Sequence, residues 1–194
     1  MKRLCVFCGS SAGQNPEYAE AARQVGCLIA SRGIALVYGG ASIGLMGMVA
    51  DSALEAGGEV IGVLPKTLAR REVSHSDLSE LHIVDTMHER KAMMANLADG
   101  FMALPGGCGT FDELFEVITW AQIGVHAKPI AILNTVGYYD PLIALFEHAI
   151  AERFVHKDHQ KLILHGTDPA ALLDKMLTYT PSVMVEKWLD PSGI

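Results

Sequence analysis

The chain has 194 residues, of which 50% are hydrophobic and 19% are charged, and its formal net charge is −7. A chain of this length and composition forms one globular domain rather than a disordered segment. The negative charge excludes a general binder of nucleic acids or membrane surfaces, because no excess of cations is available to neutralise phosphates.

Short apolar runs alternate with segments of helical pattern along the chain. Seven runs predict strands, namely residues 3–9, 34–40, 59–65, 82–85, 100–105, 129–134 and 162–165. Six segments predict helices, namely residues 16–32, 44–56, 87–98, a helix beginning near Thr110, 140–153 and 168–177. The polar stretch 66–80 is assigned no element.

This alternation of strands and helices predicts parallel strands joined by right-handed crossovers. The strand runs are apolar throughout, as in a sheet that helices cover on both faces. We therefore expect a single doubly wound, Rossmann-like α/β domain over residues 1–180, with a mostly or wholly parallel sheet of about seven strands. Residues 181–194 are expected to form a C-terminal tail.

The beginning of the chain, MKRLCVFCGSSAG, has only five apolar residues before a glycine. That run is too short for a signal peptide, and no run approaches the ~18 residues of a membrane span. We therefore expect a cytoplasmic protein with reduced cysteines.

Cys5 and Cys8 form a C-x-x-C pair. Positions i and i+3 of a strand face opposite sides, so we expect neither a redox site nor a zinc site.

Ligands of a doubly wound sheet bind at the carboxyl ends of its strands. Six stretches fall there, namely residues 9–13, 39–47, 65–67, 85–91, 105–110 and 134–137. Glycine-rich turns at helix N-termini bind anions through free N–H groups and the helix dipole. The loops 39–47 and 105–110 therefore predict a phosphorylated ligand with more than one part.

The common nucleotide-binding motifs are missing from these loops. The first strand is followed by CGSSAG rather than G-x-G-x-x-G, and neither glycine-rich loop has the lysine of G-x-x-x-x-G-K-[ST]. Dehydrogenases and kinases of the common types are therefore excluded.

An acidic residue follows the second glycine-rich loop closely. Residues 110–113 read TFDE, the T-x-x-E pattern of a capping box, with Thr110 at the N-cap and Glu113 reaching back to its N–H. In that structural role Glu113→Gln leaves the stability nearly unchanged, because glutamine also serves at this position of the box. The alternative is that Glu113 is catalytic.

Two cations lie at the start of the helix expected at 87–98. Residues 86–89, TMHE, predict a capping box and a helix that begins near Met87. Arg90 and Lys91 then fall in or just beyond the first turn, where cations are disfavoured by roughly 0.3–1 kcal/mol each. Their position at a strand's carboxyl end favours contacts with a ligand or a transition state, and the alternative is an ordinary charged surface.

An acid, an arginine and anion-binding loops around one crevice suit a reaction on a phosphorylated sugar. Cleavage of an N-glycosidic bond passes through an oxocarbenium-like state at C1′, which a carboxylate stabilises or attacks with water. We expect the phosphate at the N–H groups of 106–110, with Glu113 facing the ribose one turn deeper.

The stretch PGGCGTFDE matches the P-G-G-x-G-T-x-x-E signature, and the chain resembles the LONELY GUY (LOG) family, which is often mislabelled "lysine decarboxylase". The stretches GSSAG, GGASIGLMG, MHERK and WAQIGVHAKPIAILN extend the resemblance over nearly the whole chain. Ala41 is a departure, because many members have a third consecutive glycine there. A decarboxylase is not expected, since no lysine stands in a recognisable pyridoxal context.

The resemblance implies a phosphoribohydrolase that converts an N6-substituted adenosine 5′-monophosphate into the free base, a cytokinin, and ribose 5-phosphate. It implies no metal and no organic cofactor, and it gives Arg90 and Glu113 as the catalytic pair. The substrate-binding residues that it implies are Gly9, Ser10, Gly39, Gly40, Gly44, Met87, Lys91, Gly106, Gly107, Gly109 and Thr110.

The resemblance also implies a homodimer or a larger oligomer, with residues 115–124 at the interface beside the active site. An ordinary core helix is the other interpretation of that segment. Two alternative functions remain open from the sequence, namely a non-catalytic carrier of a nucleotide or cofactor and a general AMP glycosidase.

Overall fold

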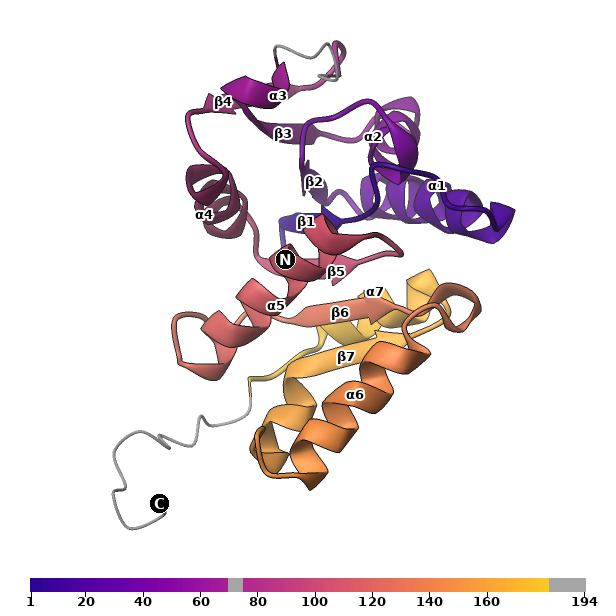
Figure 1. The fold of residues 1–194 in the computed structure, drawn as a ribbon. Helices are drawn as coiled ribbons and strands as arrows, with labels where there is room; N and C mark the ends of the chain where they lie inside the picture. Colours follow the sequence, from indigo (N-terminus) through magenta and orange to yellow (C-terminus); the bar gives the residue numbers. More distant parts are fainter. Residues whose placement is uncertain (70–74, 182–194) are drawn as a thin grey trace.

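The computed structural model describes residues 1–69 and 75–181 and shows one seven-stranded sheet with helices on both faces (Figure 1). The strands are β1 (Arg3–Phe7), β2 (Ala35–Tyr38), β3 (Val60–Pro65), β4 (Glu80–Val84), β5 (Gly100–Ala103), β6 (Ile130–Leu133) and β7 (Ile163–Gly166). The helices are α1 (Pro16–Ser31), α2 (Gly44–Glu55), α3 (Lys66–Ala69), α4 (Met87–Leu97), α5 (Cys108–Gln122), α6 (Asp140–Ala151) and α7 (Pro169–Leu177), with 3₁₀ turns η1 (Thr135–Gly137) and η2 (Lys157–Leu162).

The sheet has the strand order β4-β3-β2-β1-β5-β6-β7, and every neighbouring pair is parallel. The predicted Rossmann-like α/β fold with about seven parallel strands is confirmed. Strands β2 to β4 are added on one side of β1, and β5 to β7 are added on the other side. The carboxyl ends of β1 and β5 therefore flank the switch-point crevice in which such folds bind ligands.

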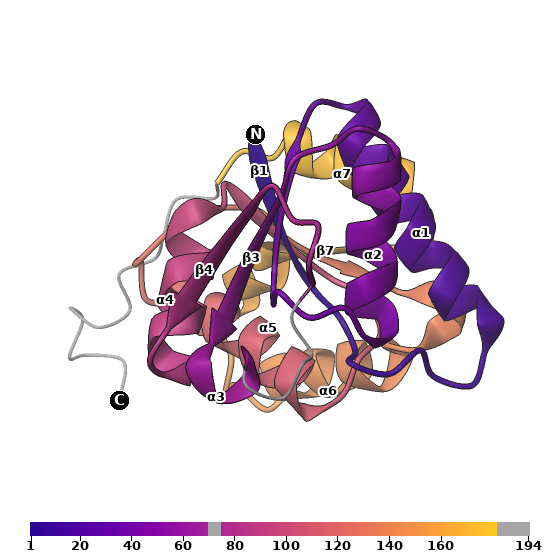
Figure 2. The ribbon, with the colours of Figure 1, turned by 90° about the horizontal axis from the view of Figure 1, so that it is seen from above.

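Two hydrophobic clusters lie on opposite faces of the sheet. One joins the sheet to α1, α2 and α7, and the other joins it to α4 and α5 (Figure 2). Successive residues of β1 alternate between the two clusters, so that Cys5 belongs to one cluster and Cys8 to the other. The expectation that these cysteines face opposite sides is confirmed, and both thiols are free and buried.

The sequence pattern missed local structure in the polar stretch 66–80. Residues Lys66–Ala69 form the short helix α3, and β4 begins at Glu80, two residues before the predicted run. This strand is at the edge of the sheet and is only partly covered, which explains its weak apolar signal.

The C-terminal tail is expected at residues 181–194, and all residues after Pro181 lie outside the described part of the chain. No described helix combines the length and hydrophobicity needed to cross a bilayer.

Candidate active site

The switch-point crevice is built from the loops that follow β1 and β5. The N–H of Gly9 donates a hydrogen bond to the Pro105 carbonyl at 3.0 Å, which joins the two loops. A Cβ atom on Gly106 would lie 2.2 Å from the Thr110 Oγ1 and 2.9 Å from the Gly9 nitrogen. Glycine is therefore required at 106 because the Thr110 side chain and the Gly9 backbone approach so closely.

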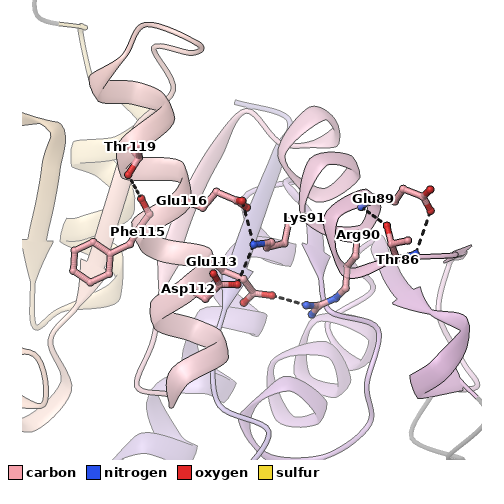
Figure 3. A network of polar contacts seen from close by, with 9 residues as sticks. All are labelled: Thr86, Glu89, Arg90, Lys91, Asp112, Glu113, Phe115, Glu116 and Thr119. Carbon is pink, nitrogen blue, oxygen red and sulfur yellow. Dashed lines mark hydrogen bonds and ion pairs between the residues drawn. The ribbon is translucent and has the colours of Figure 1, made fainter.

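The start of α4 is fixed by the capping box that the sequence predicts. The Thr86 hydroxyl accepts a hydrogen bond from the Glu89 N–H at 3.1 Å, and the Glu89 carboxylate accepts one from the Thr86 N–H at 3.3 Å (Figure 3). Helix α4 therefore begins at Met87, as predicted, and Arg90 is its fourth residue. At this position the side chain of Arg90 extends toward the carboxyl end of β3.

Arg90 and Glu113 form a buried ion pair between α4 and α5 (Figure 3). The Arg90 Nη1 donates to the Glu113 Oε1 at 2.6 Å, and the Arg90 Nε donates to the Val63 carbonyl at 3.1 Å. Arg90 is 7% exposed and Glu113 is 8% exposed. Two charges removed from water are retained only where each has a partner, and the pair satisfies that condition. Both residues are the catalytic candidates that the sequence indicates, and the structure brings them together.

Gly39 makes room for the Arg90 guanidinium. A Cβ atom at this position would lie 2.1 Å from the Arg90 Nη2 and 3.1 Å from the Met46 Sδ. The close approach of an arginine side chain therefore requires this glycine, whereas the sequence pattern indicates a phosphate loop.

The predicted capping box at residues 110–113 is wrong. Helix α5 begins at Cys108 with Gly107 as its N-cap, and no side chain in the described part of the chain caps it. Thr110 is thus the third residue of the helix and Glu113 the sixth. A side chain this far into the helix no longer reaches the N-terminus, and the Glu113 carboxylate points across to α4 instead.

Burial raises the pKa of Glu113 above the usual glutamate value, and the attraction and hydrogen bond of Arg90 offset this effect only in part. A carboxyl group in such surroundings exchanges its proton nearer to neutral pH than an exposed one. Glu113 therefore has the properties of a general acid or base, and Arg90 holds its carboxylate in a fixed orientation.

Lys91 lies between α4 and α5 and contacts two other carboxylates of α5 rather than Glu113 (Figure 3). Its Nζ is 3.0 Å from the Asp112 Oδ2 and 3.1 Å from the Glu116 Oε1 (Figure 3). Burial opposes the charge, yet the hydrogen bonds to these two carboxylates raise the pKa of Lys91. The lysine thus remains charged and links the two helices that carry the ion pair.

The two glycine-rich loops differ in how their helix N-termini are satisfied. At α2, the N–H groups of Leu45 and Met46 donate to the Gly9 carbonyl at 3.0 and 3.3 Å. A Cβ on Gly44, whose φ is +59°, would lie 2.3 Å from the Ser10 carbonyl carbon. The Gly9 carbonyl therefore accepts hydrogen bonds from two N–H groups at the start of α2, and these two are not free to bind a phosphate.

The N-terminus of α5 is open by comparison. Cβ atoms on Gly107 and Gly109 would meet no atom within 4 Å, and residues 107–109 are exposed. Packing within the described residues does not require glycine at either position. An uncapped helix N-terminus with space above it is suited to an anion.

The remaining predicted residues lie around the same crevice. Ser10 is exposed, and Met87 is 44% exposed at the first position of α4. Gly40 has a φ of +75°, and its carbonyl accepts a hydrogen bond from the His75 N–H at 3.0 Å. The residues described contain no group of three or more His, Cys, Asp or Glu side chains placed to hold a metal ion.

Residues that support this crevice were missed by the sequence analysis. The Tyr138 hydroxyl donates to the Gly106 carbonyl at 2.5 Å, and the Tyr139 hydroxyl donates to the Leu104 carbonyl at 2.7 Å. The buried His75 is 2.8 Å from the Asp51 carboxylate through its Nε2. The position of both tyrosines directly after the stretch 134–137, at a strand's carboxyl end, is the signal that could have revealed them.

Comparison with known proteins gives the family. The family model described as "Possible lysine decarboxylase" matches residues 46–176. The probable cytokinin riboside 5′-monophosphate phosphoribohydrolase LOGL1 of Oryza sativa subsp. japonica is 51% identical over 93% of this chain and 81% of its own length. The cytokinin riboside 5′-monophosphate phosphoribohydrolase LOG1 of Arabidopsis thaliana is 47% identical over 93% of this chain and 84% of its own length.

Solved structures share the fold at lower sequence identity. The molybdenum cofactor carrier protein from Chlamydomonas reinhardtii has a TM-score of 0.70 and 22% identity, over 91% of this chain and 98% of its own. The molybdenum cofactor binding protein from Rippkaea orientalis has a TM-score of 0.69 and 20% identity, over 92% and 99%. These likenesses establish the fold alone, whereas the family-model match and the far higher identity to the curated relatives show that the chain belongs to the LONELY GUY (LOG) family.

Proposed function

We propose that this protein hydrolyses the N-glycosidic bond of a cytokinin riboside 5′-monophosphate, an N6-substituted adenosine 5′-monophosphate, and releases the free base and ribose 5-phosphate. The observation that carries the proposal is the buried Arg90–Glu113 pair at the carboxyl end of the sheet. The curated relatives with 47–51% identity carry the same activity in their names.

The chemistry of the pair suits this reaction. As the bond to the base breaks, positive charge develops at C1′ and the ring oxygen of the ribose. The ionised Glu113 carboxylate stabilises that charge, and Arg90 holds the carboxylate through Oε1. Because the pair is shielded from bulk water, its electrostatic effect on the transition state is stronger than it would be at the surface.

The substrate phosphate is assigned to the N-terminus of α5. Gly106, Gly107, Gly109 and Thr110 surround this end of the helix, and Glu113 is one turn further along. This separation keeps the carboxylate away from the phosphate and next to the sugar. The proposed set of residues around the nucleotide also contains Gly9, Ser10, Gly39, Gly40, Gly44, Met87 and Lys91. Gly39 makes room for Arg90, Gly44 makes room for the Ser10 backbone, and Lys91 joins α4 to α5.

A direct test incubates the protein with isopentenyl-AMP and with AMP and measures ribose 5-phosphate. We expect release from isopentenyl-AMP, with the Glu113→Gln variant as the inactive control. Equal rates for both nucleotides would identify a general AMP glycosidase. Binding of the nucleotides without any release would identify a non-catalytic carrier.

The open space at α5 gives a prediction that separates binding from folding. Gly109→Ala is expected to stabilise the unliganded protein by up to about 1 kcal/mol, because alanine is the better helix residue and meets no neighbour. The same methyl group enters the space assigned to the phosphate, so KM for the nucleotide is expected to rise. Thermal unfolding and steady-state kinetics measure the two effects.

Gly106→Ala is the matched control for this prediction, because its Cβ would collide with Thr110 and with the Gly9 backbone. It is expected to destabilise the protein as well as impair binding. An unchanged KM in a folded Gly109→Ala enzyme would remove the phosphate from this end of α5.

The properties of Lys91 do not support a lysine decarboxylase. A lysine that forms a Schiff base needs a lowered pKa so that its amine is neutral and nucleophilic. The carboxylates of Asp112 and Glu116 have the opposite effect on Lys91. The name of the family model is therefore not the activity that we propose.

We also propose that the protein forms a homodimer, or a larger oligomer built from dimers, through the outer face of α5. Phe111, Phe115 and Trp120 line a shallow groove on this face, and Ile123 just beyond the helix is 51% exposed. Phe115 and Ile123 are exposed, whereas Phe111 and Trp120 are half-buried, and an apolar face of this kind favours a protein–protein contact. Light scattering on the purified protein should give the molar mass of at least two chains.

We also propose that the protein is located in the cytoplasm. The four cysteines are unpaired in the structure, which suits a reducing compartment. Fractionation of cells that express the full chain, with detection by antibody, tests the location.

A further inference from the structure

The direction of the backbone N–H groups in the phosphate loop depends on where the loop's carbonyl groups are bound. The described chain has no cis peptide bond. In a trans peptide plane the C=O of one residue and the N–H of the next point in opposite directions. Any partner that fixes the carbonyl of Gly106 therefore also fixes the direction of the Gly107 N–H.

The partner of the Gly106 carbonyl is the hydroxyl of Tyr138, at 2.5 Å. The Tyr138 ring is held by edge-to-face contacts with Tyr18, at a centroid distance of 5.6 Å, and with Tyr139, at 5.0 Å. Such aromatic contacts restrict the ring and so the position of its hydroxyl. The Gly107 N–H must then point away from Tyr138.

The loop that carries Tyr138 is itself fixed by Asn134. The Asn134 side chain accepts a hydrogen bond from the Tyr139 N–H at 2.7 Å and donates one to the Asp140 carboxylate at 2.7 Å. Gly137 has a φ of +71°, and a Cβ there would lie 2.6 Å from the Asp140 Oδ2. The end of β6 thus presents the tyrosine from a rigid turn.

The geometry points to Tyr138 as a positioning residue for the nucleotide phosphate. Its hydroxyl holds the Gly106 carbonyl on the protein side, and the Gly107 N–H is thereby directed into the open space at the N-terminus of α5. The Pro105 carbonyl, bound by the Gly9 N–H, orients the Gly106 N–H by the same rule. Two successive N–H groups directed in this way are the donors that we assign to the phosphate. This inference rests on the proposed function, because it assumes that a phosphate binds at α5.

Tyr139 provides a matched control within the same turn. Its hydroxyl makes a hydrogen bond of nearly the same kind, at 2.7 Å, to the Leu104 carbonyl. The residue after Leu104 is Pro105, which has no N–H, so this bond orients no donor. Loss of the Tyr139 hydroxyl therefore affects the stability of the fold but not the direction of an N–H group.

The test compares Tyr138→Phe and Tyr139→Phe by calorimetric titration with ribose 5-phosphate and with adenosine. For Tyr138→Phe we expect ribose 5-phosphate to bind about five- to tenfold more weakly, the effect of losing one neutral hydrogen bond, with adenosine affinity unchanged. For Tyr139→Phe we expect a lower melting temperature and unchanged affinity for ribose 5-phosphate. Steady-state kinetics should show a higher KM for the nucleotide in Tyr138→Phe and a smaller change in kcat.

The possible failures are distinguishable. Wild-type affinity for ribose 5-phosphate in a folded Tyr138→Phe protein would overturn the positioning role alone. Equal weakening by both tyrosine variants would assign the effect to general loosening of the loop and would also overturn it. A wild-type protein that binds neither ribose 5-phosphate nor AMP would overturn the proposed function together with this inference.

Discussion

Glu113→Gln is expected to lower kcat by at least ~10²-fold, the contribution of a carboxylate that acts in the transition state. Glutamine keeps the shape of the side chain and an acceptor for the Arg90 Nη1, but it carries no charge to stabilise the oxocarbenium-like ribose. Release of ribose 5-phosphate from isopentenyl-AMP, measured in single-turnover conditions, gives the rate of the chemical step.

The stability of the Glu113→Gln variant distinguishes the ion pair from the capping box. A capping glutamate would tolerate the change, whereas the buried Arg90 guanidinium loses its counter-charge. We expect the free energy of unfolding to fall by about 1–3 kcal/mol. Glu116→Gln, the same change one turn along the same helix, is the control, and its kcat should remain near the wild-type value. Normal turnover by a folded Glu113→Gln enzyme would refute the catalytic role.

The raised pKa of Glu113 has consequences for both activity and stability. Because the ionised form is the active one, kcat/KM should fall with decreasing pH through a midpoint above the usual glutamate value of about 4.3. The folded state binds this proton more tightly than the unfolded state. The corresponding stabilisation is fully present below the unfolded pKa and is lost as the pH rises through the raised pKa. This pH dependence of stability should be absent from Glu113→Gln.

Arg90→Ala is expected to reduce kcat as severely as Glu113→Gln does, because Arg90 holds the Glu113 carboxylate in place. Removal of the guanidinium leaves Glu113 buried without its cation, so that its pKa rises further. The pH profile of the residual activity should therefore move to higher pH, an effect that a merely structural loss would not produce. The kcat/KM of the variant between acidic and alkaline pH measures this shift.

Breaking a buried ion pair from one side costs about 3–5 kcal/mol, so Arg90→Ala should also unfold at a clearly lower temperature. Arg90→Lys is the matched variant. Lysine keeps the charge but has no planar fork to join the Val63 carbonyl and the Glu113 carboxylate, so activity should be only partly restored. Wild-type kinetics in Arg90→Ala would show that the ion pair has no part in the reaction.

Several features of the molecule follow from local sequence alone. The alternation of apolar runs with helical segments determined the parallel sheet, because buried strands and crossover helices have patterns that neighbouring residues display. The TMHE stretch determined the start of α4, since both hydrogen bonds of its capping box join residues three apart. That start placed Arg90 at the crevice.

The TFDE stretch has the same local pattern as TMHE but a different structure. Gly107, three residues before Thr110, is the N-cap of α5, and the buried Arg90 attracts the Glu113 carboxylate away from the helix end. Likewise, Gly39 and Gly44 fit a phosphate loop by sequence, but their neighbours are Arg90 and Ser10. These contacts join residues that are far apart in the chain, so no local pattern contains them.

The fold class, the carboxyl edge of the sheet as the expected ligand site, and Arg90 and Glu113 as candidate residues can thus be read from local patterns of the sequence. Folding of distant segments is needed to join these two residues in one buried pair, to bind the first N–H groups of α2 to the Gly9 carbonyl while α5 stays open, and to bring the Tyr138 hydroxyl to the Gly106 carbonyl. Hydrogen bonds within a turn depend on neighbouring residues, whereas burial and ion pairing depend on which strands and helices lie side by side.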